Sequence, residues 1–181
     1  MTTEPSETPA YVPPEMYTEL MAEFEHGTMR GLLLICASNV DWMLGLLLRA
    51  FLVDDIKIVD QMLTNDGPLA SFSARIKAAY CLGLISKPSH DKIHLLRSMR
   101  NDAAHNVESI AHVEDRVATL YHGLAYTAGQ LELRNKIVVS ATSLMIRIGQ
   151  QIEAVERRER KADDLFVNPT SPPVPPARQP E

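Results

Sequence analysis

The sequence predicts an all-α protein: a single-domain bundle of six to seven helices with disordered N- and C-terminal ends. The chain has 181 residues, 45% of them hydrophobic, which suits one globular domain. Of its twelve prolines, only Pro68 and Pro88 lie between the two ends of the chain, and a long interval with few prolines can be mostly helix. No five-residue run alternates apolar and polar side chains as a half-buried strand does. We therefore expect a flexible N-terminus over residues 1–12, the bundle over 13–164 and a proline-rich tail over 165–181.

Start and stop signals divide the interval into helices. Asp54 or Asp55 can cap a short helix, and the sequence Asn-Asp-Gly-Pro at 65–68 is a strong break. Apolar residues recur three or four positions apart in the segments between such signals, which is the spacing of one helix face. The expected helices cover residues 15–25, 28–53, 54–63, 71–82, 86 or 89 to 104, 113–127 and 133–164.

The apolar segment 31–53 is long enough to span a membrane, but Asn39, Asp41 and Arg49 lie inside it. Each charged group at mid-bilayer costs about 2.5–3.5 kcal/mol, so a central buried helix explains the segment better. The first residues are polar and acidic, without the apolar run of a signal peptide. Cys36 and Cys81 are too few for a disulfide framework or a zinc site, and both are expected to be buried in a reducing environment. We expect a cytoplasmic protein with no membrane contact, no metal and no cofactor.

The charge balance argues against a protein that coats nucleic acid. The chain has 18 basic and 23 acidic residues, a net charge of −5. Binding to the phosphate backbone of DNA requires clustered lysine and arginine. No helix-turn-helix with a basic recognition helix is evident, so direct DNA binding is not expected.

Arg100 is predicted to point into the bundle, because it lies on the same helix face as Ile93 and Leu96. Removing a guanidinium from water costs several kcal/mol unless a partner is present. Asp41, embedded in the apolar segment, has the same requirement with the opposite sign. A structural Arg100–Asp41 ion pair would satisfy both.

His105 follows Arg100 by five positions, which places the two side chains about 140° apart on a straight helix. They could converge if the helix ended near Ala104 with Asn106 as a left-handed cap, or across the axis of a dimer. A histidine that moves protons and an arginine that stabilises phosphorane charge can cleave RNA without metal.

Ser71, Ser73 and Arg75 stand at a predicted helix start, where backbone N–H groups and the helix dipole favour anions. They form a possible anion-binding site, and ordinary helix capping by the serines is the alternative. His90 and His94 have the i, i+4 spacing of a metal pair, but no third ligand is placed near them, and exposed histidines are the expected interpretation.

Three stretches of sequence carry a family resemblance: GPLASFSARIKAAY at 67–80, LGLIS at 82–86, and Arg97 to His105. Over about residues 28–110 the chain resembles the mannitol-operon repressor family. That resemblance implies an all-helical fold and a negative regulator of transcription that has no recognisable DNA-binding domain. It would then act through a protein partner, and we expect a homodimer.

Arg100-Asn101 followed by His105 also resembles the signature of the HEPN superfamily of helical bundles. This second resemblance implies the alternative function, a metal-independent ribonuclease or toxin, or its inactive descendant, with RNA as substrate. It would make Arg100 and His105 the catalytic pair, with Asn101 as a supporting residue and Asp41 orienting the pair.

Overall fold

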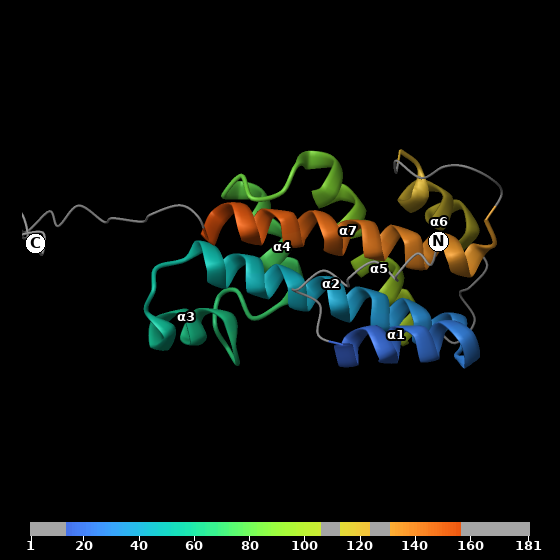
Figure 1. Ribbon diagram of the computed structural model, residues 1–181, viewed down its shortest axis with the longest axis horizontal. Helices are drawn as coiled ribbons and strands as arrows, with labels where there is room; N and C mark the ends of the chain where they lie inside the picture. The colour runs from blue at the N-terminus through green and yellow to red at the C-terminus, as the bar shows by residue number, and fades with distance from the viewer. Residues whose placement is uncertain (1–13, 106–112, 124–130, 157–181) are drawn as a thin grey trace, which may run out of the picture.

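The computed structural model describes residues 14–105, 113–123 and 131–156 (Figure 1). Within these ranges it contains seven α-helices and no strand, which confirms the all-α prediction. The expected flexible ends lie outside the described residues. The helices are α1 (Pro14–His26), α2 (Met29–Phe51), α3 (Ile56–Leu63), α4 (Phe72–Cys81), α5 (Lys87–His105), α6 (Val113–Tyr121) and α7 (Leu133–Glu156).

Helix α2 is the centre of the bundle. It lies beside α7 along most of its length and also packs against α1, α4 and α5 (Figure 1). It is the one helix of the described part that is long and apolar enough to cross a membrane, judged by length and composition alone. Five of its leucines are buried in the core, Leu32, Leu33, Leu44, Leu47 and Leu48. Each fully buried leucine stabilises the fold by about 1.5–3 kcal/mol.

Helix α7 supplies the second long apolar stripe. Six of its apolar residues, spaced three or four positions apart along one face, are buried: Ile137, Ala141, Leu144, Ile148, Ile152 and Val155. The described part of the helix ends at Glu156, so the expected continuation to residue 164 lies outside the described residues.

Polar side chains begin several of the helices, as expected. Thr28 accepts a hydrogen bond from the Gly31 N–H, Asp55 from Ile58, Ser71 from Ala74 and Ser86 from Ser89. Each bond satisfies an N–H group that has no acceptor within its own helix. The structure also decides between Asp54 and Asp55, because Asp55 is the N-cap of α3.

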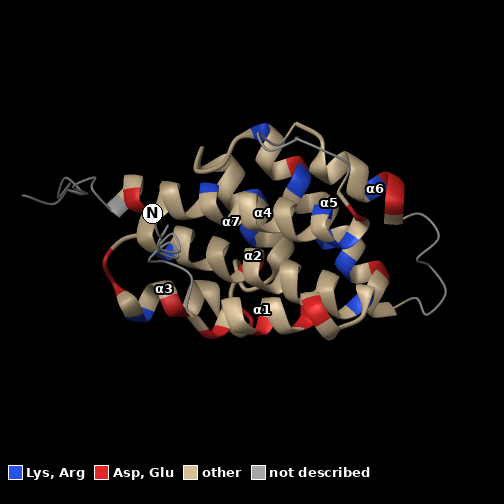
Figure 2. Ribbon diagram, turned by 45° about the vertical axis from the view of Figure 1, so that its right-hand side comes forward, with Lys and Arg blue, Asp and Glu red and all other residues tan. Residues whose placement is uncertain are grey.

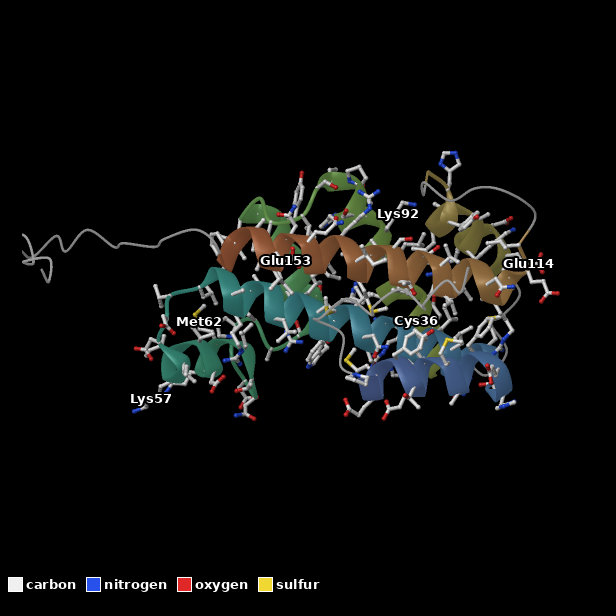
Figure 3. The ribbon with its side chains drawn as sticks, in the orientation of Figure 1. Cys36, Lys57, Met62, Lys92, Glu114 and Glu153 are labelled. Atoms are coloured by element: carbon white, nitrogen blue, oxygen red, sulfur yellow. The ribbon has the colours of Figure 1, made fainter. Side chains whose placement is uncertain are left out.

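Helix α6 is shorter than predicted. It ends at Tyr121, and Gly123 follows with a φ of 74°, a left-handed conformation that glycine adopts readily. The Lys92 ammonium, labelled in Figure 3, donates hydrogen bonds to the carbonyl oxygens of Leu120 and His122 at 2.5 and 2.6 Å. The helix expected over 113–127 thus ends earlier than predicted, and a lysine from α5 satisfies its last carbonyl groups. Residues 124–127 lie outside the described part.

The two cysteines have different environments. Cys36 in α2 is fully buried, as expected, and burial raises the pKa of its thiol to about 12, which keeps it protonated (Figure 3). Cys81 is exposed, so its predicted burial is wrong. It is the last residue of α4 and lies on a different face from the buried residues Ile76 and Ala79.

Candidate functional site

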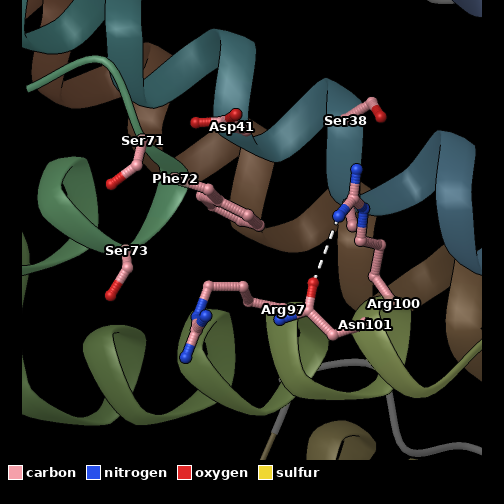
Figure 4. Close-up of a pocket in the computed structure, with 9 residues that line it drawn as sticks. Ser38, Asp41, Ser71, Phe72, Ser73, Arg97, Arg100 and Asn101 are labelled. Atoms are coloured by element: carbon pink, nitrogen blue, oxygen red, sulfur yellow. Dashed lines mark hydrogen bonds between the residues drawn. The ribbon is translucent and has the colours of Figure 1, made fainter. Parts of the chain in front are cut away.

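A polar pocket of about 280 Å³ lies where α2, the start of α4 and the middle of α5 meet (Figure 4). Its side chains are mostly charged or hydroxyl-bearing. The lining residues are Ala37, Ser38, Asp41, Ser71, Phe72, Ser73, Arg97, Arg100 and Asn101. Asp41, Ser71, Ser73, Arg100 and Asn101 were singled out from the sequence as candidate site residues. The fold thus brings five of the seven candidates into one cavity.

Asp41 is held by Arg75, which does not line this pocket. Arg75 Nη1 donates to Asp41 Oδ1 at 2.9 Å, Nε to the Leu69 carbonyl at 3.0 Å and Nη2 to the Leu63 carbonyl at 3.0 Å. All three guanidinium nitrogens therefore have acceptors within the chain. The predicted Arg100–Asp41 ion pair is wrong, because Asp41 is paired with Arg75 of α4. Arg75 is one of the residues for which the sequence predicts anion binding.

The Asp41 carboxyl remains electrostatically coupled to both arginines. Burial raises the pKa of Asp41 above its ordinary value, while the charge and hydrogen bond of Arg75 and the charge of Arg100 act to lower it. Arg100 is thus close enough to influence Asp41 without bonding to it.

Arg100 turns towards the pocket, as predicted from its helix face, and Asn101 supports it. Arg100 Nη1 donates to Asn101 Oδ1 at 3.1 Å, the bond drawn in Figure 4. Both side chains are half-buried. The supporting role that the HEPN resemblance implies for Asn101 stays a prediction.

Arg97 is the residue of this site that sequence reasoning missed. Its Nη2 lies 3.4 Å from His94 Nε2, and its Nε is buried without a hydrogen-bond partner among the described residues. The available signal was its spacing: it precedes Arg100 by three positions, so the two share one side of α5.

His105 is the last residue of α5 and is exposed; it does not line the pocket. The helix continues through Ala104 without a break, and the proposed cap, Asn106, lies outside the described residues. The chain by itself does not bring His105 beside Arg100 in this cavity. Their convergence across two copies of the chain stays a prediction.

Ser71 and Ser73 lie at the N-terminus of α4 and line the pocket (Figure 4). Ser71 is the N-cap, and its Oγ accepts from the Ala74 N–H at 3.2 Å. Capping and anion binding are compatible here, because the hydroxyl proton of Ser71 remains able to donate.

The described residues contain no group of three or more histidine, cysteine or acidic side chains arranged to hold a metal ion. His90 packs against the Tyr80 ring and lies 2.8 Å from Asp91 Oδ1. Its ring centroid is 6.2 Å from that of His94. The i, i+4 histidines thus contact neighbouring side chains on the surface formed by α4 and α5.

Comparison with known proteins gives a consistent set of relatives. The sequence profile of a family described as mannitol repressor matches residues 27–159. The mannitol operon repressors of Escherichia coli strains K12 and CFT073 are 32% identical over 75 residues, which is 40% of this chain and 38% of each relative. The matched stretch therefore spans well under half the length of these curated relatives.

One solved structure has the same fold. The X-ray structure of the MtlR–HPr complex from Escherichia coli superposes with a TM-score of 0.52 at 19% sequence identity. The match covers 78% of this chain and 98% of the chain compared. At this identity, the likeness shows a shared arrangement of helices.

Proposed function

The chain belongs to the mannitol repressor family, and from this premise we propose that it is a negative regulator of transcription that acts by binding another protein. The observation that carries the proposal is the extent of the family match, which runs from residue 27 to residue 159 and so includes α2 to α7. The regulatory role comes from the family, and the mode of action is argued from the charges of this chain.

Six basic side chains of the described bundle are engaged within the chain. They donate to its own carboxylates or backbone carbonyls: Arg49, Arg75, Lys87, Lys92, Arg116 and Arg134. Helix α1 has four glutamates and no lysine or arginine, and it forms an acidic face in Figure 2. DNA binding requires cations that are free to meet phosphates, so this distribution favours repression through a protein partner.

The first partner to test is HPr, because the solved relative is a complex with HPr. The direct experiment mixes the purified chain with HPr from the same organism and measures binding by isothermal titration calorimetry. We expect a saturable complex. Its absence, together with intact repression in cells, would assign the role to another protein.

The regulatory role is tested in cells. Deleting the gene should raise expression of a reporter driven by the mannitol operon promoter, and restoring the full chain should lower it. In parallel, the purified chain should not retard the promoter fragment in a gel at physiological salt. Sequence-specific retardation by the chain alone would overturn the proposed mode of action.

The ribonuclease alternative rests on Arg100 and Asn101, which the structure holds in contact within one pocket. It requires His105 to reach that pocket from a second copy of the chain, so it requires the expected homodimer. Light scattering measures the oligomeric state. Incubating RNA with the chain in EDTA then tests the activity: cleavage that His105→Ala abolishes would replace the regulator with an enzyme.

A further inference from the structure

The pocket between α2, α4 and α5 is lined by two cations, Arg97 and Arg100, and by one carboxylate, Asp41, which is paired with Arg75. Among the described residues, no carboxylate lies within ion-pair distance of Arg97 or Arg100. Their recorded contacts are a side-chain amide oxygen and a histidine nitrogen, and the Arg97 Nε is buried without a partner. Because a buried donor without a partner is unfavourable, these two side chains have capacity for an acceptor that the chain does not supply.

The start of α4 adds donors to the same cavity. The first hydrogen bond to a backbone N–H of this helix comes at Ala74, from Ser71 Oγ, and the next at Arg75, from the Ser71 carbonyl. The N–H groups of Phe72 and Ser73 have no acceptor among the described residues, as expected in the first turn of a helix. The positive end of the helix dipole lies there too. Donors thus approach the cavity from α4 as well as from α5.

The carboxylates near the pocket are already neutralised. Asp41 lines it, but its charge is paired with Arg75 at 2.9 Å. Asp102, next to Asn101 on α5, is paired with Arg116 Nη1 at 2.5 Å. Because both carboxylates are paired, the charges of Arg97 and Arg100 give the cavity an excess of positive charge.

We propose that this pocket binds a phosphate group, either as free phosphate or as the monoester of a small molecule. A tetrahedral oxyanion has three or four oxygens that point in different directions, so it can accept at once from donors on two helices, a guanidinium of α5 and the N-terminus of α4. A carboxylate offers two oxygens in one plane, which match a single guanidinium best. The volume of about 280 Å³ lies just below the range of about 300–1,000 Å³ for drug-sized ligands, which limits the ligand to a small metabolite.

The proposal does not rest on the regulatory function, and its test needs only the purified chain. The probes are inorganic phosphate and glycerol 3-phosphate, with glycerol as the uncharged control and sodium chloride holding ionic strength constant. A ligand that binds the folded chain raises the Tm as its concentration passes the Kd. We expect both phosphates to raise the Tm by an amount that grows with the logarithm of their concentration above the Kd, and glycerol to have no effect. A lower Kd for glycerol 3-phosphate assigns the site to monoesters, and equal values assign it to free phosphate.

Charge-removing variants locate the effect. Arg97→Gln and Arg100→Gln should each weaken phosphate binding by about ten- to a hundredfold, the range expected for one charge-assisted hydrogen bond. Lys77→Gln is the matched control, because Lys77 is exposed on α4 and does not line the pocket. It removes the same charge and should leave the Kd unchanged.

Two variants that add a negative charge distinguish an effect on phosphate binding from an effect on folding. Ser73→Asp places a carboxylate at a helix N-terminus, where it favours the helix, yet it puts negative charge in the cavity and should abolish phosphate binding. Ser89→Asp makes the same change in the first turn of α5, outside this pocket, and should leave binding intact. A phosphate-dependent rise in Tm that is equal in all five variants, or no rise in the wild-type chain, would overturn the proposal.

Discussion

Arg75 and Arg97 show two ways in which a bundle can accommodate a half-buried guanidinium. Arg75 uses all three of its nitrogens on acceptors of its own chain, one of them the Asp41 carboxylate. Arg97 has a buried Nε with no partner among the described residues and a single 3.4 Å contact to His94. The difference teaches that burial alone does not reveal the role of an arginine. The hydrogen-bond acceptors around it reveal the role. A guanidinium whose donors all have acceptors in the chain holds helices together, and one with unused donors is available to a ligand.

The largest expected effect is the loss of the Arg75 cluster. Arg75→Met should lower the free energy of unfolding by about 2–3 kcal/mol, because it leaves the Asp41 carboxylate and two backbone carbonyls without their charged donor. Urea denaturation monitored by circular dichroism measures the change. Lys77→Met, on the exposed face of the same helix, should stay within about 0.5 kcal/mol of the wild type. Equal costs for the two variants would remove the distinction between the two kinds of arginine.

The next effect comes from the helix that faces Arg75. A Cβ added at Gly45 of α2 would lie 3.7 Å from Arg75 Cζ and Nη1, an ordinary van der Waals contact. Gly45→Ala should therefore be tolerated and can stabilise the helix by up to about 1 kcal/mol. Gly45→Leu has no such room, and displacing the guanidinium should cost about 1–3 kcal/mol. The same urea measurement compares the two. A leucine that is tolerated as well as alanine would show that the guanidinium position is not fixed.

The sequence predicts the local features of this comparison and misses the pairing. Ser71 and Asp55 were recognisable as caps because capping depends on neighbours three positions away. Arg100 was recognisable as inward-facing from helix periodicity alone. Asp41, however, pairs with a residue 34 positions away, and that choice depends on how α4 docks against α2. Either arginine would have satisfied the charge of Asp41, so the sequence could state the need for a cation without identifying it.

A smaller effect is the pH dependence of the free energy of unfolding that the paired Asp41 carboxylate causes. Burial raises the pKa of Asp41 above its ordinary value, so the stability that its protonated form contributes is present at low pH and is lost as the pH rises through the folded-state pKa. Arg75 opposes this rise, and without it the pKa of Asp41 should move higher still. The stability gap between the wild type and Arg75→Met should therefore be widest near pH 7 and narrow as the pH falls towards 4. Urea titrations at several pH values measure the gap, and Asp41→Asn in both backgrounds should remove its pH dependence.

The smallest expected effect on stability is that of replacing Arg97, the arginine without an ion pair. Arg97→Gln should change the free energy of unfolding by no more than about 0.5 kcal/mol, because it removes no ion pair and leaves no carbonyl or carboxylate without a donor. The buried Nε disappears with the guanidinium, which offsets the packing that the shorter side chain loses. The variant should thus unfold at the urea concentration of the wild type while its affinity for phosphate falls by about ten- to a hundredfold. A cost comparable to that of Arg75→Met would instead place Arg97 among the residues that hold α5 in the bundle, and the cavity would then be a gap between structural arginines.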